Sequence, residues 1–180
     1  MTSPPVPSGK HRMTRLYDYV GPHHLVDLAT SPIPRHEPTA NTALVAWLRE
    51  QYGNVEAITL TYVVTDQGRL RVSDRHTEHV ACAQGSRVRA AGELELSIEG
   101  SEASVVGVTN QSTGYCPEPS CFPEVQRALL EAGLEPPDSF SHAFTFRRCP
   151  GCGGITIVKD DDFECPACGE ALPREWNFGT

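Results

Sequence analysis

The chain has 180 residues and a formal net charge of −8, and 39% of its residues are hydrophobic. This length suits one domain, or one domain with a small appendage, and the apolar fraction is enough for a packed core. Because an acidic chain repels the phosphate backbone, general nucleic-acid binding is disfavoured. No apolar run approaches the roughly 18 residues that a membrane helix needs, so we expect no membrane partner.

The first 13 residues, MTSPPVPSGKHRM, contain three prolines and no hydrophobic periodicity, which predicts a disordered arm over 1–13. This stretch lacks the apolar segment of a secretory signal. The chain also has an odd number of cysteines, seven, which argues against a secreted disulfide scaffold. We therefore expect a cytoplasmic protein that uses cysteine to bind metal.

Two helices are predicted upstream of the cysteine-rich end. One covers Ala43–Tyr52, with Asn41 or Thr42 capping its N-terminus. The other begins at Pro123, a residue that suits the first helical position, and ends at Gly133. Both helices are expected to bury one apolar face against a sheet.

Two hairpins are predicted between these helices. Apolar residues recur at every second position of 58–64, and the chain returns over 70–72. A second alternating segment, 94–98, pairs with 104–109 after a short turn. Charged residues on the outward positions indicate an antiparallel sheet with one face in water. We therefore predict an α+β domain over 14–140, built on an antiparallel sheet of four or more strands.

Four cysteines near the C-terminus form two Cys-Pro-x-Cys-Gly segments, with Cys149 and Cys152 in the first and Cys165 and Cys168 in the second. Each segment makes a tight turn that points both sulfurs inward, and its glycine relieves the backbone that follows. Two such turns at the ends of a hairpin place four sulfurs in a tetrahedron, each about 2.3 Å from a zinc ion. The spacing predicts one four-cysteine metal site per chain.

This doubled motif resembles the zinc-ribbon modules, with their rubredoxin-like knuckles, over residues 149–180 only. In such a ribbon, the alternation at 155–158 forms one strand and Phe163 begins the return strand. The resemblance implies a structural zinc ion, because a closed shell of four thiolates leaves no open position for a substrate. A strand over 143–148 leads into the module without a flexible break, so we expect 141–180 to pack on the α+β domain.

The same spacing also resembles the iron-binding, rubredoxin-like tail of rubrerythrins, since tetrahedral sulfur sites accept either metal. Those proteins are recognised in addition by a di-iron helical bundle with Glu-x-x-His motifs. No glutamate stands three residues before any histidine in this chain, and the upstream segments have the pattern of a sheet. Zinc is therefore the expected metal, and an iron electron carrier is the alternative.

A second functional hypothesis is an enzyme whose pocket is built from two upstream loops. His76, Glu78, His79 and Cys82 follow a predicted strand, and loops after strands often carry chemistry. In a helical turn His76 and His79 share a face, where they can orient Cys82 as a nucleophile. The Asn110–Cys121 loop supplies small polar residues. The competing interpretation is a polar loop with two solvated histidines and a buried cysteine.

The remaining cysteine pair, Cys116 and Cys121, has a loose spacing with three interpretations. The pair is half of a second zinc site, a redox pair, or two ordinary thiols. No hydrolase, metalloprotease or dinucleotide-binding motif occurs in the chain. We therefore favour an interaction or accessory protein, whose protein partner or small-molecule ligand the sequence does not identify.

Overall fold

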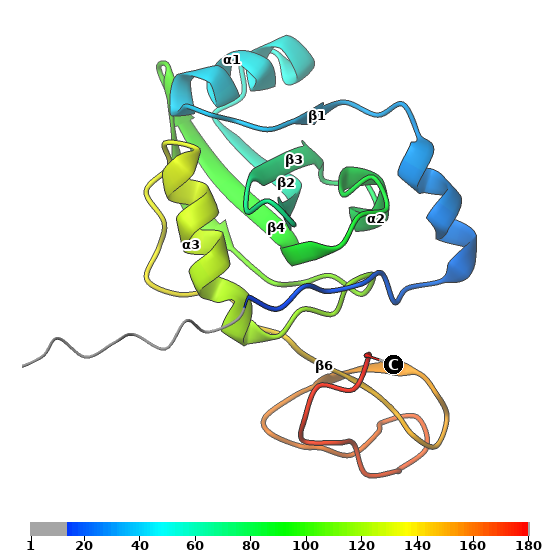
Figure 1. Ribbon diagram of the computed structural model, residues 1–180. Coiled ribbons are helices and arrows are strands. Elements are labelled where there is room, and N and C mark those ends of the chain that lie inside the picture. Colours follow the sequence, from blue (N-terminus) through cyan, green and yellow to red (C-terminus); the bar gives the residue numbers. More distant parts are fainter. Residues whose placement is uncertain (1–13, 180) are drawn as a thin grey trace, which may run out of the picture.

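An antiparallel sheet of five strands forms the centre of the molecule, in the order β1-β3-β2-β4-β5 (Figure 1). The computed structural model describes residues 14–179, so the arm predicted over 1–13 lies outside the described residues. Both predicted hairpins are confirmed, because β2 pairs with β3 and β4 pairs with β5. The strands are β1 (Arg35–His36), β2 (Ala57–Thr65), β3 (Leu70–Asp74), β4 (Val88–Glu99) and β5 (Glu102–Val108).

The two predicted helices are also present, and each begins within two residues of its predicted start. The helical elements are η1 (His23–Thr30), α1 (Asn41–Tyr52), α2 (His79–Cys82), η2 (Pro119–Cys121) and α3 (Phe122–Glu131). Helices combined with an antiparallel sheet confirm the α+β fold class. None of the helices in residues 14–179 has the length and apolarity needed to cross a membrane.

The predicted N-cap of α1 is wrong. Ala40 occupies the cap position and makes no side-chain hydrogen bond to the helix. The Asn41 side chain instead reaches the edge strand β5, where its Oδ1 accepts from the Ala103 N–H at 2.7 Å and its Nδ2 donates to the Ala103 carbonyl at 2.8 Å. The Asn41 side chain therefore hydrogen-bonds to a distant strand rather than to its own helix.

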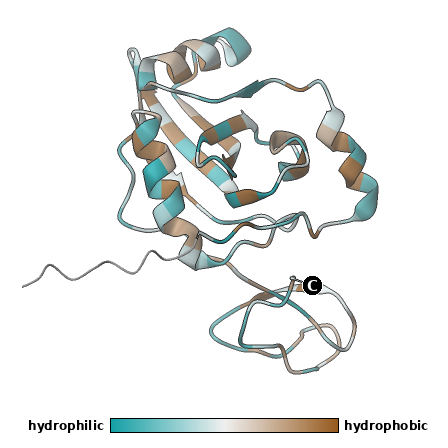
Figure 2. Cartoon of the chain, in the orientation of Figure 1, coloured by the Kyte–Doolittle hydropathy of each residue, from teal (hydrophilic) through white to brown (hydrophobic). Residues whose placement is uncertain are grey.

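The sheet has one buried face, as the alternating pattern predicts. On β4, Leu94, Leu96 and Ile98 are buried, whereas Glu95 and Glu99 are exposed. α1 packs mainly on β5, and α3 packs on β3 and β4. Figure 2 shows the apolar residues along these strands and helices, and a paler C-terminal module. The module therefore has little apolar surface from which to build a core of its own.

A second, two-stranded sheet belongs to the C-terminal module and consists of β6 (Thr145–Arg148) and β7 (Ile155–Val158). The strand predicted to begin at Phe163 is wrong, because the partner of β7 is β6 and the later segment forms only isolated bridges. The Phe163 carbonyl accepts from the Leu172 N–H at 2.7 Å. The returning chain therefore pairs across the second cysteine turn and is not available to β7.

Candidate metal centre

Two backbone turns of the same design present the four cysteines. The N–H of Gly153 donates to the Cys149 carbonyl at 2.9 Å, and the N–H of Gly169 donates to the Cys165 carbonyl at 2.8 Å. These glycines have φ angles of +74° and +75°, which residues with a side chain rarely adopt. The glycine that ends each Cys-Pro-x-Cys-Gly segment is therefore needed for the turn itself.

The four sulfurs meet at one point of the module. The Sγ atoms of Cys149, Cys152, Cys165 and Cys168 all lie within 4.8 Å of one another. The Cys149–Cys168 pair is 3.5 Å apart and the Cys152–Cys165 pair is 3.8 Å apart. A tetrahedron with metal–sulfur bonds of about 2.3 Å has edges of about 3.8 Å. The arrangement therefore fits a tetrahedral metal ion.

The backbone around the Cys165 sulfur favours its charged form. N–H groups of Ala167 and Cys168 donate to the Cys165 sulfur and lower its pKa to about 6. A thiolate is the form that binds metal, so this turn prepares one ligand at neutral pH. Cys149 and Cys165 are buried, whereas Cys152 and Cys168 are exposed, so the centre has one side toward the protein and one toward solvent.

The apolar cluster beneath the centre is small. Cys149, Cys165 and Leu172 are its buried members, with Val158 and Phe163 packed against them. A cluster of this size does not hold a folded module by hydrophobic burial alone. The four cysteines have the chemistry to hold one transition-metal ion, and that ion would supply the missing cross-links.

Arg147 joins the module to the main domain. Its side chain is buried, and its Nη1 lies 2.6 Å from the Glu118 carboxylate in the segment before η2. The same guanidinium donates to the carbonyls of Pro173 and Arg174 at 3.0 and 2.8 Å. One buried cation therefore ties β6, the main domain and the C-terminal tail together. Sequence reasoning missed it, and the one available signal is an arginine pair that directly follows the apolar residues of a strand.

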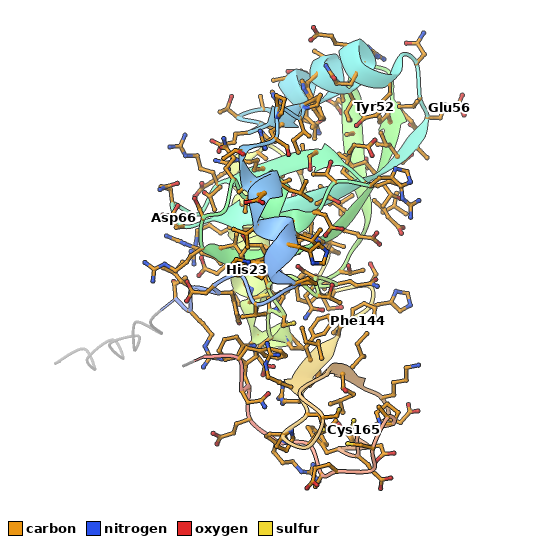
Figure 3. All side chains as sticks on the ribbon, turned by 90° about the vertical axis from the view of Figure 1, so that its right-hand side faces the viewer. His23, Tyr52, Glu56, Asp66, Phe144 and Cys165 are labelled. Carbon is orange, nitrogen blue, oxygen red and sulfur yellow. The ribbon has the colours of Figure 1, made fainter. Side chains whose placement is uncertain are left out.

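Trp176 makes a second junction. Its indole N–H donates to the Cys116 carbonyl at 2.8 Å, and its ring meets Tyr17 edge-on with centroids 5.6 Å apart. Trp176 also packs on Phe178, which is itself buried. Figure 3 shows the module below the main domain, with Phe144 near the junction and Cys165 farther out. The aromatic residues of the tail therefore cover the junction.

The four candidate catalytic residues have separate surroundings. His76 is exposed and its Nδ1 lies 3.0 Å from the Asp74 carboxylate, whereas the His79 Nε2 lies 3.0 Å from the Gly92 carbonyl. Burial lowers the pKa of His79 and raises the pKa of the buried Cys82 thiol to about 11. Glu78 is exposed. At neutral pH, Cys82 is therefore a protonated thiol and a weak nucleophile.

The second candidate loop is held by structural hydrogen bonds. Asn110 is buried and donates from Nδ2 to the carbonyls of Pro117 and Phe144 at 2.8 and 2.7 Å. The Ser112 hydroxyl accepts from the Tyr115 N–H at 3.3 Å. Three surface depressions in the described chain are lined by residues of other segments. A pocket shared by the two candidate loops stays a prediction.

Cys116 and Cys121 point into different apolar clusters. Cys116 packs with Phe146 and Phe178 at the junction, whereas Cys121 belongs to the core of the main sheet. Burial raises the pKa of each thiol to about 12. Within residues 14–179, the potential metal-binding group consists of Cys149, Cys152, Cys165 and Cys168. The surroundings favour two ordinary buried thiols over a second metal site.

No protein-family model matches the chain, and neither the curated proteins nor the solved structures include a match. The four-cysteine geometry and the contacts around it are therefore the basis for a functional proposal.

Proposed function

We propose that the chain binds one zinc ion through its four C-terminal cysteines and acts as an interaction or accessory protein. The observation that carries this proposal is the set of four cysteine sulfurs within 4.8 Å of one another. Four thiolates complete the coordination that zinc adopts in structural sites, so a substrate has no coordination position to occupy. The ion is a structural element, and function lies on the surfaces that it helps to hold in place.

The surroundings of the site support a structural role for zinc. The cluster of apolar residues beneath the sulfurs is small, whereas Arg147 and Trp176 connect the module firmly to the main domain. Metal binding in such a module is coupled to its folding, because the ligands have no preformed arrangement in the unfolded chain. Zinc loss is therefore expected to release both junction residues.

The fold of the main domain favours zinc over iron at this site. The main domain is an antiparallel sheet with short helices, and the helices that hold a di-iron centre in rubrerythrins have no counterpart in the described chain. A tetrathiolate iron centre is red when oxidised, whereas a zinc centre is colourless, so the absorption spectrum of the purified protein separates the two metals.

Metal analysis of the wild-type chain and of two single variants tests this proposal. We expect one zinc and less than a tenth as much iron per wild-type chain. Cys165→Ser removes one ligand, so zinc content should fall by at least tenfold. Cys121→Ala is the matched control, because Cys121 is buried in the main core away from the module. It should retain one zinc.

Three results would count against this proposal. Iron in place of zinc, with a red protein, would support the electron-carrier alternative. Two zinc ions per wild-type chain would implicate Cys116 and Cys121 in a second site. Full zinc occupancy in Cys165→Ser, with unchanged stability, would show that the four cysteines are not the site.

A further inference from the structure

The outer edge of β5 borders a groove of about 600 Å³. The groove lies between this edge strand and the segment that follows α3, which runs beside the helix in Figure 1. Its volume falls within the range of about 300–1,000 Å³ that is usual for ligand sites. The residues that matter for its chemistry are Glu102, Val105, Leu130, Glu135, Pro136 and Pro137.

Asn41 and Ser141 occupy the two ends of the β5 edge and leave its middle open. Asn41 binds both backbone groups of Ala103, and Ser141 binds both backbone groups of Val108. The β4–β5 ladder is regular from Glu102 to Val105 and has a bulge at Val106. Because residues of a regular antiparallel ladder alternate, the N–H and C=O of Val105 point to the same outer side as those of Ala103. No loop backbone group within residues 14–179 pairs with Val105.

Apolar side chains are unusually exposed beside this open position. Leu130, on α3 at the groove, is 56% exposed, and Val106, next along β5, is 64% exposed. Pro136 and Pro137 form part of the same wall. An edge strand with free backbone groups and neighbouring apolar side chains is a template for pairing with another extended chain.

The rim of the groove is acidic. Glu102 and Glu135 line it, both exposed, and none of its lining residues is lysine or arginine. Exposed Glu99 and Glu131 lie close by in the chain. This charge favours a basic occupant and disfavours a second copy of the chain, since two copies would bring acidic rims together.

We infer that this groove binds an extended segment of a partner protein that alternates apolar residues and carries basic residues at its ends. The inference rests on the proposed interaction role and names the surface and partner chemistry for it. The segment pairs its backbone with Val105, buries an apolar side chain against Leu130 and places its cations at Glu102 and Glu135. Main-chain bonds supply affinity in this mode, and the alternate side chains supply specificity.

A labelled peptide of defined sequence tests the inference. The probe has nine residues, with valine and leucine alternating with threonine between paired lysines, and is made in both alternation registers. Fluorescence anisotropy with the full-length, zinc-loaded protein should give a Kd on the order of 100 μM for at least one register, as expected of a small interface. Replacing the lysines with glutamates should weaken binding at least tenfold, and raising the salt concentration should weaken it as well.

Two surface variants locate the binding. Leu130→Asp should weaken binding about tenfold, because it places a charge on the apolar wall, and Glu102→Lys should do so by reversing the rim charge. Val26→Asp is the matched control, since Val26 is 39% exposed on η1, across the molecule from α3 (Figure 1). It should leave the Kd unchanged.

The inference is overturned if neither register binds below 1 mM, if Leu130→Asp binds as well as wild type, or if the chain dimerises through this edge. None of these results changes the zinc content. Failure of the groove and failure of the proposed zinc site are therefore distinguishable, because metal analysis of the same samples reports on the latter alone.

Discussion

At the residue scale, Asn41 is of a type that favours helix caps, yet its side chain hydrogen-bonds to a distant strand. Asparagine before an apolar helix predicts a local cap, but the side chain spans to Ala103, which is 62 positions away. Gly133 allows the turn after α3 to approach the start of α1, because a Cβ there would lie 2.9 Å from the Asn41 backbone nitrogen. Sequence spacing carries no signal for such a contact.

Asn41→Ala should therefore destabilise the edge of the sheet more than the helix. The change leaves the N–H and C=O of the buried Ala103 without their partner, which costs about 1–3 kcal/mol in free energy of unfolding. Urea denaturation measures this difference. Asn54→Ala, at an exposed position after α1, is the control and should change stability little. Equal effects of the two variants would refute the role given to Asn41.

His36 makes a pH-dependent contribution to stability. Its ring stacks on Trp47 with centroids 5.3 Å apart, and its buried Nε2 has no hydrogen-bond partner within residues 14–179. Burial lowers the pKa of His36. The unfolded chain, with a histidine pKa of about 6.5, then binds protons more readily than the folded chain. The free energy of unfolding should therefore fall as pH decreases from about 6.5 through the lower folded-state pKa.

The substitution His36→Phe keeps an aromatic ring on Trp47 and removes the titrating group. Wild type should lose stability relative to this variant as pH decreases from about 7.5 to about 5, because only wild type contains the His36 imidazole. Denaturation curves at several pH values measure the difference. A pH-independent difference would show that His36 titrates alike in the folded and unfolded chains.

At the scale of elements, strong periodicity predicts structure better than cysteine spacing does. The alternation in β4 and the apolar face of α1 identify these elements because each buries a regular stripe. The spacing of Cys149, Cys152, Cys165 and Cys168 predicts the cluster of four sulfurs but not the strand pairing. β7 pairs with β6, the strand that precedes it in the chain. The first cysteine turn, rather than hydrophobic alternation, sets the register of this pair.

Arg147 makes β6 the element through which the module depends on the main domain. Arg147→Met keeps the apolar stem but leaves Glu118 and two tail carbonyls without their cation, so about 3 kcal/mol of stability should be lost. Chemical denaturation measures the loss, and zinc content should stay at one per chain. Arg127→Met, at an exposed position on α3, is the control. Unchanged stability in Arg147→Met would contradict the role of this junction.

At the scale of the whole molecule, a small four-cysteine module is attached to a domain with a conventional core. The core of the main sheet includes Trp176 among its packed neighbours, and the junction also contains Cys116 and Phe178. The sequence predicts both parts, but the contacts between them come from single residues without a pattern. Loss of the ion should consequently lower the stability of the main domain as well as that of the module.

Thermal unfolding of the zinc-loaded chain, with and without a chelator, tests the central claim most directly. Circular dichroism follows the main sheet, whose strands lie outside the metal module. If chelation releases about 2 kcal/mol of junction contacts, the midpoint should fall by about 4–8 °C, given about 2–4 °C per kcal/mol for a chain of this size. The same midpoint with and without zinc, in samples where metal analysis confirms its removal, would contradict a structural zinc that holds the module on the domain.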